Sequence, residues 1–175
     1  MTLTRLIYSS QISDDFEHHD IKKILAIANK RNHQKGISGL LVFDHKSFLQ
    51  CLEGPRPEVN RLYSKIVTDP RHTDITLLDV SDITNRQFGS WGMGYVPDAK
   101  ITQKIVFKYS ATQSFDPAKM SGSDVIDLLL DLREHIPVID LREQSEAQRQ
   151  SSTDTPVAPV DATPTTSIGG DIANA

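Results

Sequence analysis

Cysteine is almost absent from this chain of 175 residues, and long apolar runs are absent altogether. The single cysteine, Cys51, excludes a disulfide within the chain and a cysteine-rich zinc site. No stretch approaches the roughly 18 apolar residues of a membrane-spanning helix, and the first residues, MTLTR, lack the apolar run of a signal peptide. We therefore expect a protein of the reducing cytoplasm that has no membrane partner.

An excess of basic charge is missing as well. Residues 143–175 hold five acids and one base, so the net charge of −4 belongs to this segment, while the 18 acids and 18 bases of residues 1–142 balance. Nucleic acid would require clustered Lys and Arg side chains, so it is not expected as a partner. Residues 143–175 also lack aromatic side chains and are rich in Ser, Thr, Pro and Ala, which predicts a disordered tail.

Hydrophobic patterning predicts five strands and two amphipathic helices in the first part of the chain. The strands are expected at residues 3–9, 38–44, 47–53, 75–80 and 91–96. The first helix is expected from Asp20, its N-cap, to about residue 33, and the second from Pro57 to the break at Asp69-Pro70. The order β-α-β-β-α-β-β is typical of an α+β ferredoxin-like sandwich with one extra strand, in which two helices cover one face of a sheet.

A C-terminal helical cap is expected to follow this sandwich. Residues 104–109 suggest a short extended piece, and residues 117–134 a helix with an apolar stripe. Because the segment comes after a complete sandwich, it must pack on the free face of the sheet or against another subunit.

Motifs for phosphate, metal and hydrolytic chemistry are not found. Gly89, Gly92 and Gly94 superficially suggest a phosphate loop, but their spacing is wrong and no helix follows, so we interpret them as glycines that allow close approach. The adjacent His18 and His19 would point to different faces of a helix, so no metal site is expected.

Several polar or redox-capable side chains lie on otherwise apolar elements. Tyr8 and Gln50 share their strand faces with apolar residues, so both are expected inside, where an unpaired polar group would cost about 1–3 kcal/mol. Trp91 and Met93 are two residues apart and are expected on one face of the last strand. Periodicity leaves two interpretations open: Tyr8 and Gln50 satisfy one another in an ordinary core, or they face a bound group.

Five short segments follow one another at a specific spacing. They are RLIYSS (5–10), Asn32 with GISGLL (36–41), FLQCLEG (48–54), DPRH (69–72), and Phe88 with WGM (91–93). Together they resemble a BLUF domain, the flavin-binding blue-light sensor, over about residues 2–97. The next segment, from Lys108 to Met120, is similar to the C-terminal cap of short, single-domain BLUF proteins of the PixD type. The resemblance thus divides the chain into a BLUF domain (1–97), a helical cap (98–142) and the tail (143–175).

The resemblance implies a flavin held non-covalently between the two helices and the sheet, with FAD expected and FMN as the alternative. In that arrangement Tyr8 would donate an electron and a proton to the excited flavin, and Gln50 would bridge Tyr8 and the flavin edge. A Gln amide carries both a donor and an acceptor, so reorienting or tautomerising it changes the group that faces the flavin and shifts absorption slightly to the red. Met93 and Trp91 would report the change outward.

The remaining contacts that the resemblance implies surround the flavin. They are Asn32 at the polar edge of the ring, Ile24 on its face, Asp69 at the ribityl chain, and Arg71 and His72 at the phosphates. Two alternatives stay open: Arg71 is equally well read as a solvated surface charge, and related short proteins often carry Asn-Asn where this chain has Arg31-Asn32.

The resemblance implies a photoreceptor without catalysis of its own, a ring-like homo-oligomer whose contact with a response-regulator-like partner changes with light. The alternative is a small flavin-dependent redox enzyme using the same pocket, although no nicotinamide motif or spare acid–base pair favours it. A hydrolase of the acylphosphatase kind is discounted because residues 9–12, SSQI, offer no phosphate loop with a catalytic Arg.

Overall fold

The computed structural model describes residues 2–14, 16, 21–96, 103–110 and 115–135, and its centre is one mixed sheet in the strand order β4-β1-β3-β2-β5. The strands are β1 (Leu3–Ile12), β2 (Ser38–Phe43), β3 (Ser47–Pro55), β4 (His72–Ile83) and β5 (Gly94–Val96). Neighbouring strands are antiparallel except β2 and β5, which are parallel. The β2–β3 hairpin turns at Asp44, whose carboxylate accepts hydrogen bonds from the backbone N–H groups of Lys46 and Ser47.

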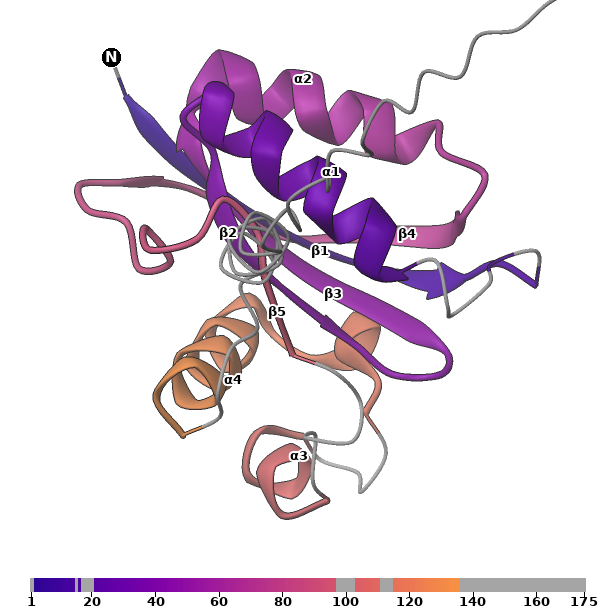
Figure 1. Cartoon of the computed structure of the whole chain (residues 1–175). Helices are drawn as coiled ribbons and strands as arrows, with labels where there is room; N and C mark the ends of the chain where they lie inside the picture. The colour runs from indigo at the N-terminus through magenta and orange to yellow at the C-terminus, as the bar shows by residue number, and fades with distance from the viewer. Residues whose placement is uncertain (1, 15, 17–20, 97–102, 111–114, 136–175) are drawn as a thin grey trace, which may run out of the picture.

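Helices cover both faces of this sheet (Figure 1). The first face carries α1 (Ile21–Gln34) and α2 (Arg56–Val67), and the other carries α3 (Gln103–Tyr109) and α4 (Gly122–His135), preceded by a short 3₁₀ turn (Pro117–Lys119). The predicted α+β sandwich with an extra strand and a helical cap is confirmed. The cap lies on the free face of the sheet, one of the two places expected for it. The predicted disordered tail lies outside the described residues.

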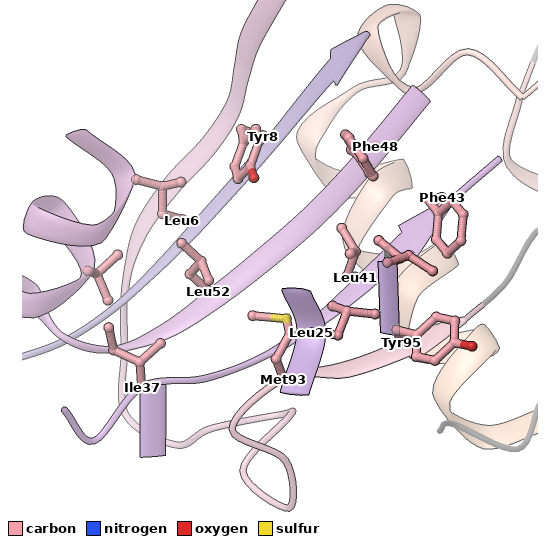
Figure 2. Close-up of a cluster of buried hydrophobic side chains, with 12 residues drawn as sticks. Leu6, Tyr8, Leu25, Ile37, Leu41, Phe43, Phe48, Leu52, Met93 and Tyr95 are labelled. Atoms are coloured by element: carbon pink, nitrogen blue, oxygen red, sulfur yellow. The ribbon is translucent and has the colours of Figure 1, made fainter. Parts of the chain in front are cut away.

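Two apolar cores result, one on each side of the sheet. The first, between the sheet and α1 and α2, includes Leu6, Tyr8, Leu25, Leu41, Phe48, Leu52 and Met93 (Figure 2). The second, between the sheet and α4, includes Ile7, Leu40, Leu49, Cys51, Phe88, Val125, Leu128, Leu129 and Leu132. The central strands are therefore buried on both faces, and alternate residues of β1 and β3 belong to different cores.

The segment before β5 differs from its prediction. β5 begins only at Gly94, and Trp91 and Met93 precede it, so the alternation of a strand does not apply to them. Met93 joins the first core and Trp91 the second, and the prediction that they share one face was wrong. The physical reason is Gly92, which lies so close to the α1 backbone at Asn29 that a Cβ atom would overlap the Asn29 carbonyl. The interpretation of this glycine as a close-approach residue is confirmed.

Residues 104–109, predicted to be extended, instead form most of α3. Ile105 and Tyr109, one helical turn apart, pack against the core that contains α4, and Val106 is buried as well. The expected N-cap of α1, Asp20, lies outside the described residues.

None of the helices formed by the described residues is long and apolar enough to span a membrane. The same residues contain no group of three His, Cys, Asp or Glu side chains that could hold a metal ion.

The close approach of β2 to β3 at Gly39 can be tested by measuring the stability of a variant. In Gly39→Ala the new methyl group would overlap the Cys51 carbonyl on β3, and we expect a loss of about 3 kcal/mol, the upper range of overpacking. Gly89→Ala is the matched control, because its methyl group would meet only the Arg86 side chain at 3.5 Å. Urea unfolding of both variants measures the difference, and equal stability would contradict the strand packing.

Candidate functional site

A cavity of about 510 Å³ lies between α1, α2 and the sheet. Its size falls within the roughly 300–1,000 Å³ of small-molecule and cofactor pockets. Its walls are mainly apolar, with Ile24 and Leu25 from α1, Leu62 and Ile66 from α2, and Leu41 from the sheet. A mainly apolar cavity with a few polar groups suits a flat aromatic ligand.

The inner wall of the cavity holds a buried hydrogen-bonded pair. Tyr8 on β1 lies directly opposite Gln50 on β3, and the Tyr8 hydroxyl donates to Gln50 Oε1 at 2.5 Å. Gln50 Nε2 points the other way and donates to Met93 Sδ at 3.3 Å. Burial raises the pKa of Tyr8 far above its ordinary value, with smaller contributions from Tyr63 and Asp69, so the phenol keeps its proton as a donor.

Asn32 on α1 reaches the cavity from the side opposite β1. It is buried, lines the cavity, and donates from Nδ2 to the carbonyl of Gly92 at 3.1 Å. One turn earlier, Asn29 Nδ2 donates to the carbonyl of Met93 at 3.4 Å. Asn29 was not predicted as a site residue, although its spacing of three residues from Asn32 puts both amides on one helix face. The two Asn side chains fix the segment that carries Met93 against α1.

The cavity is also lined by Asp69, Arg71 and His72. Asp69 and Arg71 bond to each other, whereas His72 has a different partner. Arg71 Nε donates to Asp69 Oδ1 at 2.8 Å, and this bond lowers the pKa of Asp69 to about 2. His72 instead turns toward β1, where its Nδ1 lies 2.8 Å from Ser10 Oγ. Its ring meets that of Tyr8 edge-on at 6.1 Å. Burial lowers the pKa of His72, so the imidazole is neutral at pH 7.

The cavity therefore gathers most of the predicted site residues. Its lining includes Ile24, Asn32, Gln50, Asp69, Arg71 and His72. Tyr8 and Met93 lie behind Gln50 and contact it directly. Trp91 is placed elsewhere, half-buried in the core on the α4 side of the sheet.

Basic side chains also line the cavity. Arg31 comes from α1, Lys35 from the turn that follows it, and Arg61 and Lys65 from α2, and all four are exposed. Arg61 is paired with Glu58. Lys35, Arg61 and Lys65 were not predicted, because the sequence around an exposed Lys or Arg does not indicate which cavity it borders.

A family model, BLUF, described as "Sensors of blue-light using FAD", matches residues 3–94 of this chain. The chain belongs to the BLUF family. BLUF domains bind FAD, and the cavity, with its apolar walls and the Tyr8–Gln50 pair, has a size and lining that suit such a ligand.

Two relatives place the BLUF match in longer proteins. The chain is 43% identical over 91 residues to the blue light- and temperature-regulated antirepressor BluF of Escherichia coli (strain K12), covering 52% of this chain and 23% of BluF. It is 39% identical over 89 residues to photoactivated adenylate cyclase subunit beta of Euglena gracilis, covering 51% of this chain and 10% of that subunit. The matched part is thus about a quarter or less of these relatives.

Solved structures of BlsA match more of the chain. The BlsA photo-activated state has a TM-score of 0.67 at 30% identity and covers 74% of this chain and 94% of BlsA. The BlsA ground state has a TM-score of 0.68 at 27% identity and covers 79% of this chain and 92% of BlsA. Because the two scores are nearly equal, the backbone resembles the two light states of BlsA to the same degree.

The half-buried side chain of His72 leads us to predict a pH-dependent stability. The unfolded chain takes up a proton on this imidazole near pH 6.5, about the ordinary value, whereas the folded chain resists it because the folded pKa is lower. The free energy of unfolding should therefore fall between about pH 7 and 5, by at most about 1.4 kcal/mol per pH unit for one proton. The contribution of Asp69 is lost only below about pH 4, as its carboxylate is protonated.

Urea unfolding across this range measures the decline. We expect His72→Gln to flatten the decline between about pH 7 and 5, since the half-buried imidazole that would be charged is gone. His33→Gln, which alters an exposed histidine of α1, should leave the slope unchanged. A His72→Gln slope equal to that of the parent would contradict the assignment.

Proposed function

We propose that this BLUF protein senses blue light with FAD bound in the cavity between α1, α2 and the sheet, and signals by changing its contacts with other proteins. The observation that carries the proposal is the buried Tyr8–Gln50–Met93 chain of hydrogen bonds at the cavity wall. Gln50 is the only member that lines the cavity. A reorientation of the Gln50 amide would therefore alter both its contact with a ligand in the cavity and its bonds to Tyr8 and Met93.

The amide of Gln50 can exchange its two bonds at low cost. Its oxygen accepts from Tyr8 and its nitrogen donates to a thioether, which is a weak acceptor. In the proposed reaction Tyr8 would pass an electron and its phenolic proton to the light-excited flavin and then take both back, so that no net oxidation remains. Gln50 would rotate or tautomerise while the proton is away. The exchanged amide would then donate a stronger hydrogen bond to the flavin edge, and Met93 Sδ would lose its donor, Gln50 Nε2. When bound, the flavin would supply the light absorption and act as the electron acceptor.

The rest of the cavity supports the same ligand. Asn32 would meet the polar edge of the ring and Ile24 its face, as both line the cavity beside Gln50. Lys35 and Lys65, which line the same cavity, would neutralise the phosphates. Asp69 remains the proposed contact of the ribityl chain, with Arg71 held in place by it. We assign His72 to the wall beside Tyr8 rather than to the phosphates, because its Nδ1 is bonded to Ser10.

Signalling is proposed to run through protein contacts and to need no catalysis by this chain. BluF is a light-regulated antirepressor, and the Euglena proteins are subunits of adenylate cyclases, so BLUF segments serve different outputs. For this chain we propose a homo-oligomer in the cytoplasm that binds a response-regulator-like partner in a light-dependent way.

Removing the phenol tests the photochemistry. Tyr8→Phe keeps the ring in the core but removes the hydroxyl that donates to Gln50. We expect the purified variant to hold FAD, with its small red shift after blue light abolished. Absorption spectra before and seconds after illumination measure this.

Tyr63→Phe is the matched control, because Tyr63 packs against the Tyr8 ring at 5.6 Å and lies outside the Tyr8–Gln50–Met93 chain of hydrogen bonds. It should retain the red shift and its recovery in darkness. A parent protein whose flavin bleaches irreversibly would favour the redox-enzyme alternative, and a Tyr8→Phe variant that still shifts would overturn the mechanism.

The phosphate assignment predicts a selective loss of affinity. In Lys65→Gln, FAD should bind about tenfold more weakly, since a charge-assisted hydrogen bond contributes about 1.5–3 kcal/mol. Riboflavin, which has no phosphate, should bind unchanged. Lys30→Gln is the control, because Lys30 is exposed on α1 but does not line the cavity. Fluorescence titration measures both ligands, and an equal loss for riboflavin would show a structural effect instead.

A further inference from the structure

Exposed apolar side chains are concentrated on one part of the surface. Among the described residues, five large apolar side chains are between 48% and 63% exposed, and they are Ile27, Val67, Leu77, Val80 and Phe107. Three of the five belong to the neighbouring elements α2 and β4. Scattered apolar side chains are normal on a folded protein, whereas a contiguous group of them marks an interaction site.

One side of α2 turns away from the cavity and faces β4. Ile66 lines the cavity, and Val67 lies about 100° further round the helix. Tyr63, one turn before Val67, lies on the same side as Val67. Arg56 lies on this side as well and forms an ion pair with Asp82 of β4, which shows that this side of α2 borders the strand.

β4 presents its exposed apolar side chains on the face of the sheet that carries α2. Leu77 lies opposite Tyr8 of β1, and Val80 lies opposite Leu6. Opposed residues of paired strands project to the same face, and Tyr8 and Leu6 belong to the core beneath α1 and α2. β4 is the edge strand, so its side chains are only partly covered. We call this surface the α2–β4 patch, formed by Tyr63, Val67, Leu77 and Val80.

The backbone edge of β4 is unsuited to pairing with a further strand. β4 has two register shifts against β1, and at one of them Asp74 has a positive φ of 47°. Such bulges bend an edge strand and interrupt regular pairing. Gly122 at the start of α4 also lies against the Leu78 carbonyl, which a Cβ atom would approach to 3.0 Å. A partner is therefore expected to pack on the side chains of the patch.

The two ends of the patch carry charges of both signs. Arg56 and Asp82 form an exposed pair at one end, and at the other end the exposed Asp74 follows the Asp69–Arg71 pair. A two-fold axis through the middle of the patch would set Arg56 of each copy against Asp74 of the other. It would also place the two α2 helices antiparallel, so that opposite ends of their dipoles meet. An apolar centre with a charged rim is the usual anatomy of a protein interface.

We propose that the α2–β4 patch is the contact between two copies of this chain that are related by a two-fold axis. The inference rests on the homo-oligomer of the proposed function and does not depend on its photochemistry. The 12 residues of α2 are about 18 Å long, so the contact falls at the low end of specific interfaces and should be reversible. Because Tyr63 packs on the ring of Tyr8 at 5.6 Å, one side chain separates the contact from the Tyr8–Gln50 pair.

Sedimentation of the full FAD-loaded chain in darkness, over a range of concentrations, measures the dissociation constant of this contact. In Leu77→Gln we expect the constant to rise about tenfold or more, because a two-fold contact loses the apolar side chain twice. Phe107→Gln is the matched control, since Phe107 is 63% exposed on α3, on the other face of the sheet. It should keep the constant of the parent.

A second variant guards against a failure of Leu77→Gln to fold. Val80→Thr keeps the β-branched shape of an exposed side chain and adds a hydroxyl, so it should also weaken the contact. FAD content should match that of the parent in every variant, because the patch lies outside the cavity lining.

Asp74→Asn tests how the two copies are oriented. Asn tolerates the positive φ at this position, so the substitution removes only the charge. We expect the contact to weaken at low salt and to approach that of the parent at high salt, where the charge is screened. Asp127→Asn, which alters an exposed acid of α4, is the control and should have no effect. Equal behaviour of the two variants would overturn the two-fold arrangement.

The outcomes distinguish this inference from the rest of the proposed function. A parent that stays monomeric at every concentration overturns both the inference and the homo-oligomer, and leaves the patch to a different protein or to residues 143–175 of this chain. A red shift after blue light in the same sample would show that light sensing stands. A parent that self-associates but responds equally to Leu77→Gln and Phe107→Gln overturns the patch alone.

Discussion

The pairing of β1 with β3 is the constraint on which the rest of the structure depends. One register places Tyr8 opposite Gln50 and Arg5 opposite Glu53. Because the two pairs are three residues apart, they project to opposite faces of the sheet, one into the cavity and one beneath residues 86–93. A slip of one residue would exchange the faces and bury the ion pair where the flavin is proposed to lie.

The sequence was most informative where this alternation is regular. Tyr8 and Gln50 stand among apolar residues at a spacing of two, so their burial could be predicted, and the order of elements led to the correct sandwich. The same rule failed for Trp91 and Met93, because it applies only inside a strand and β5 begins after both. The helical stripe of α3 was missed because a seven-residue segment is too short for periodicity to separate helix from strand.

Contacts between side chains and irregular backbone could not be predicted. The sequence places the acidic Glu53 in a predicted strand but does not indicate its partners. Gln87 and Phe88 lie 34 and 35 residues further along the chain. The bond from Arg133 to Gln87 spans 46 residues and ends on an exposed loop residue. No local pattern encodes such distances, since each depends on how two cores bring separate elements together.

The reactivity of Cys51 depends on whether the second core is closed. Its thiol is fully buried beneath the α4 side of the sheet, and this burial, together with the nearby Glu53, raises its pKa well above the ordinary value. As the sole cysteine of the chain, it is shielded from alkylating reagents while α4 is docked. Opening of that interface would expose this one thiol, so the rate of its alkylation would measure undocking of α4 without an introduced label.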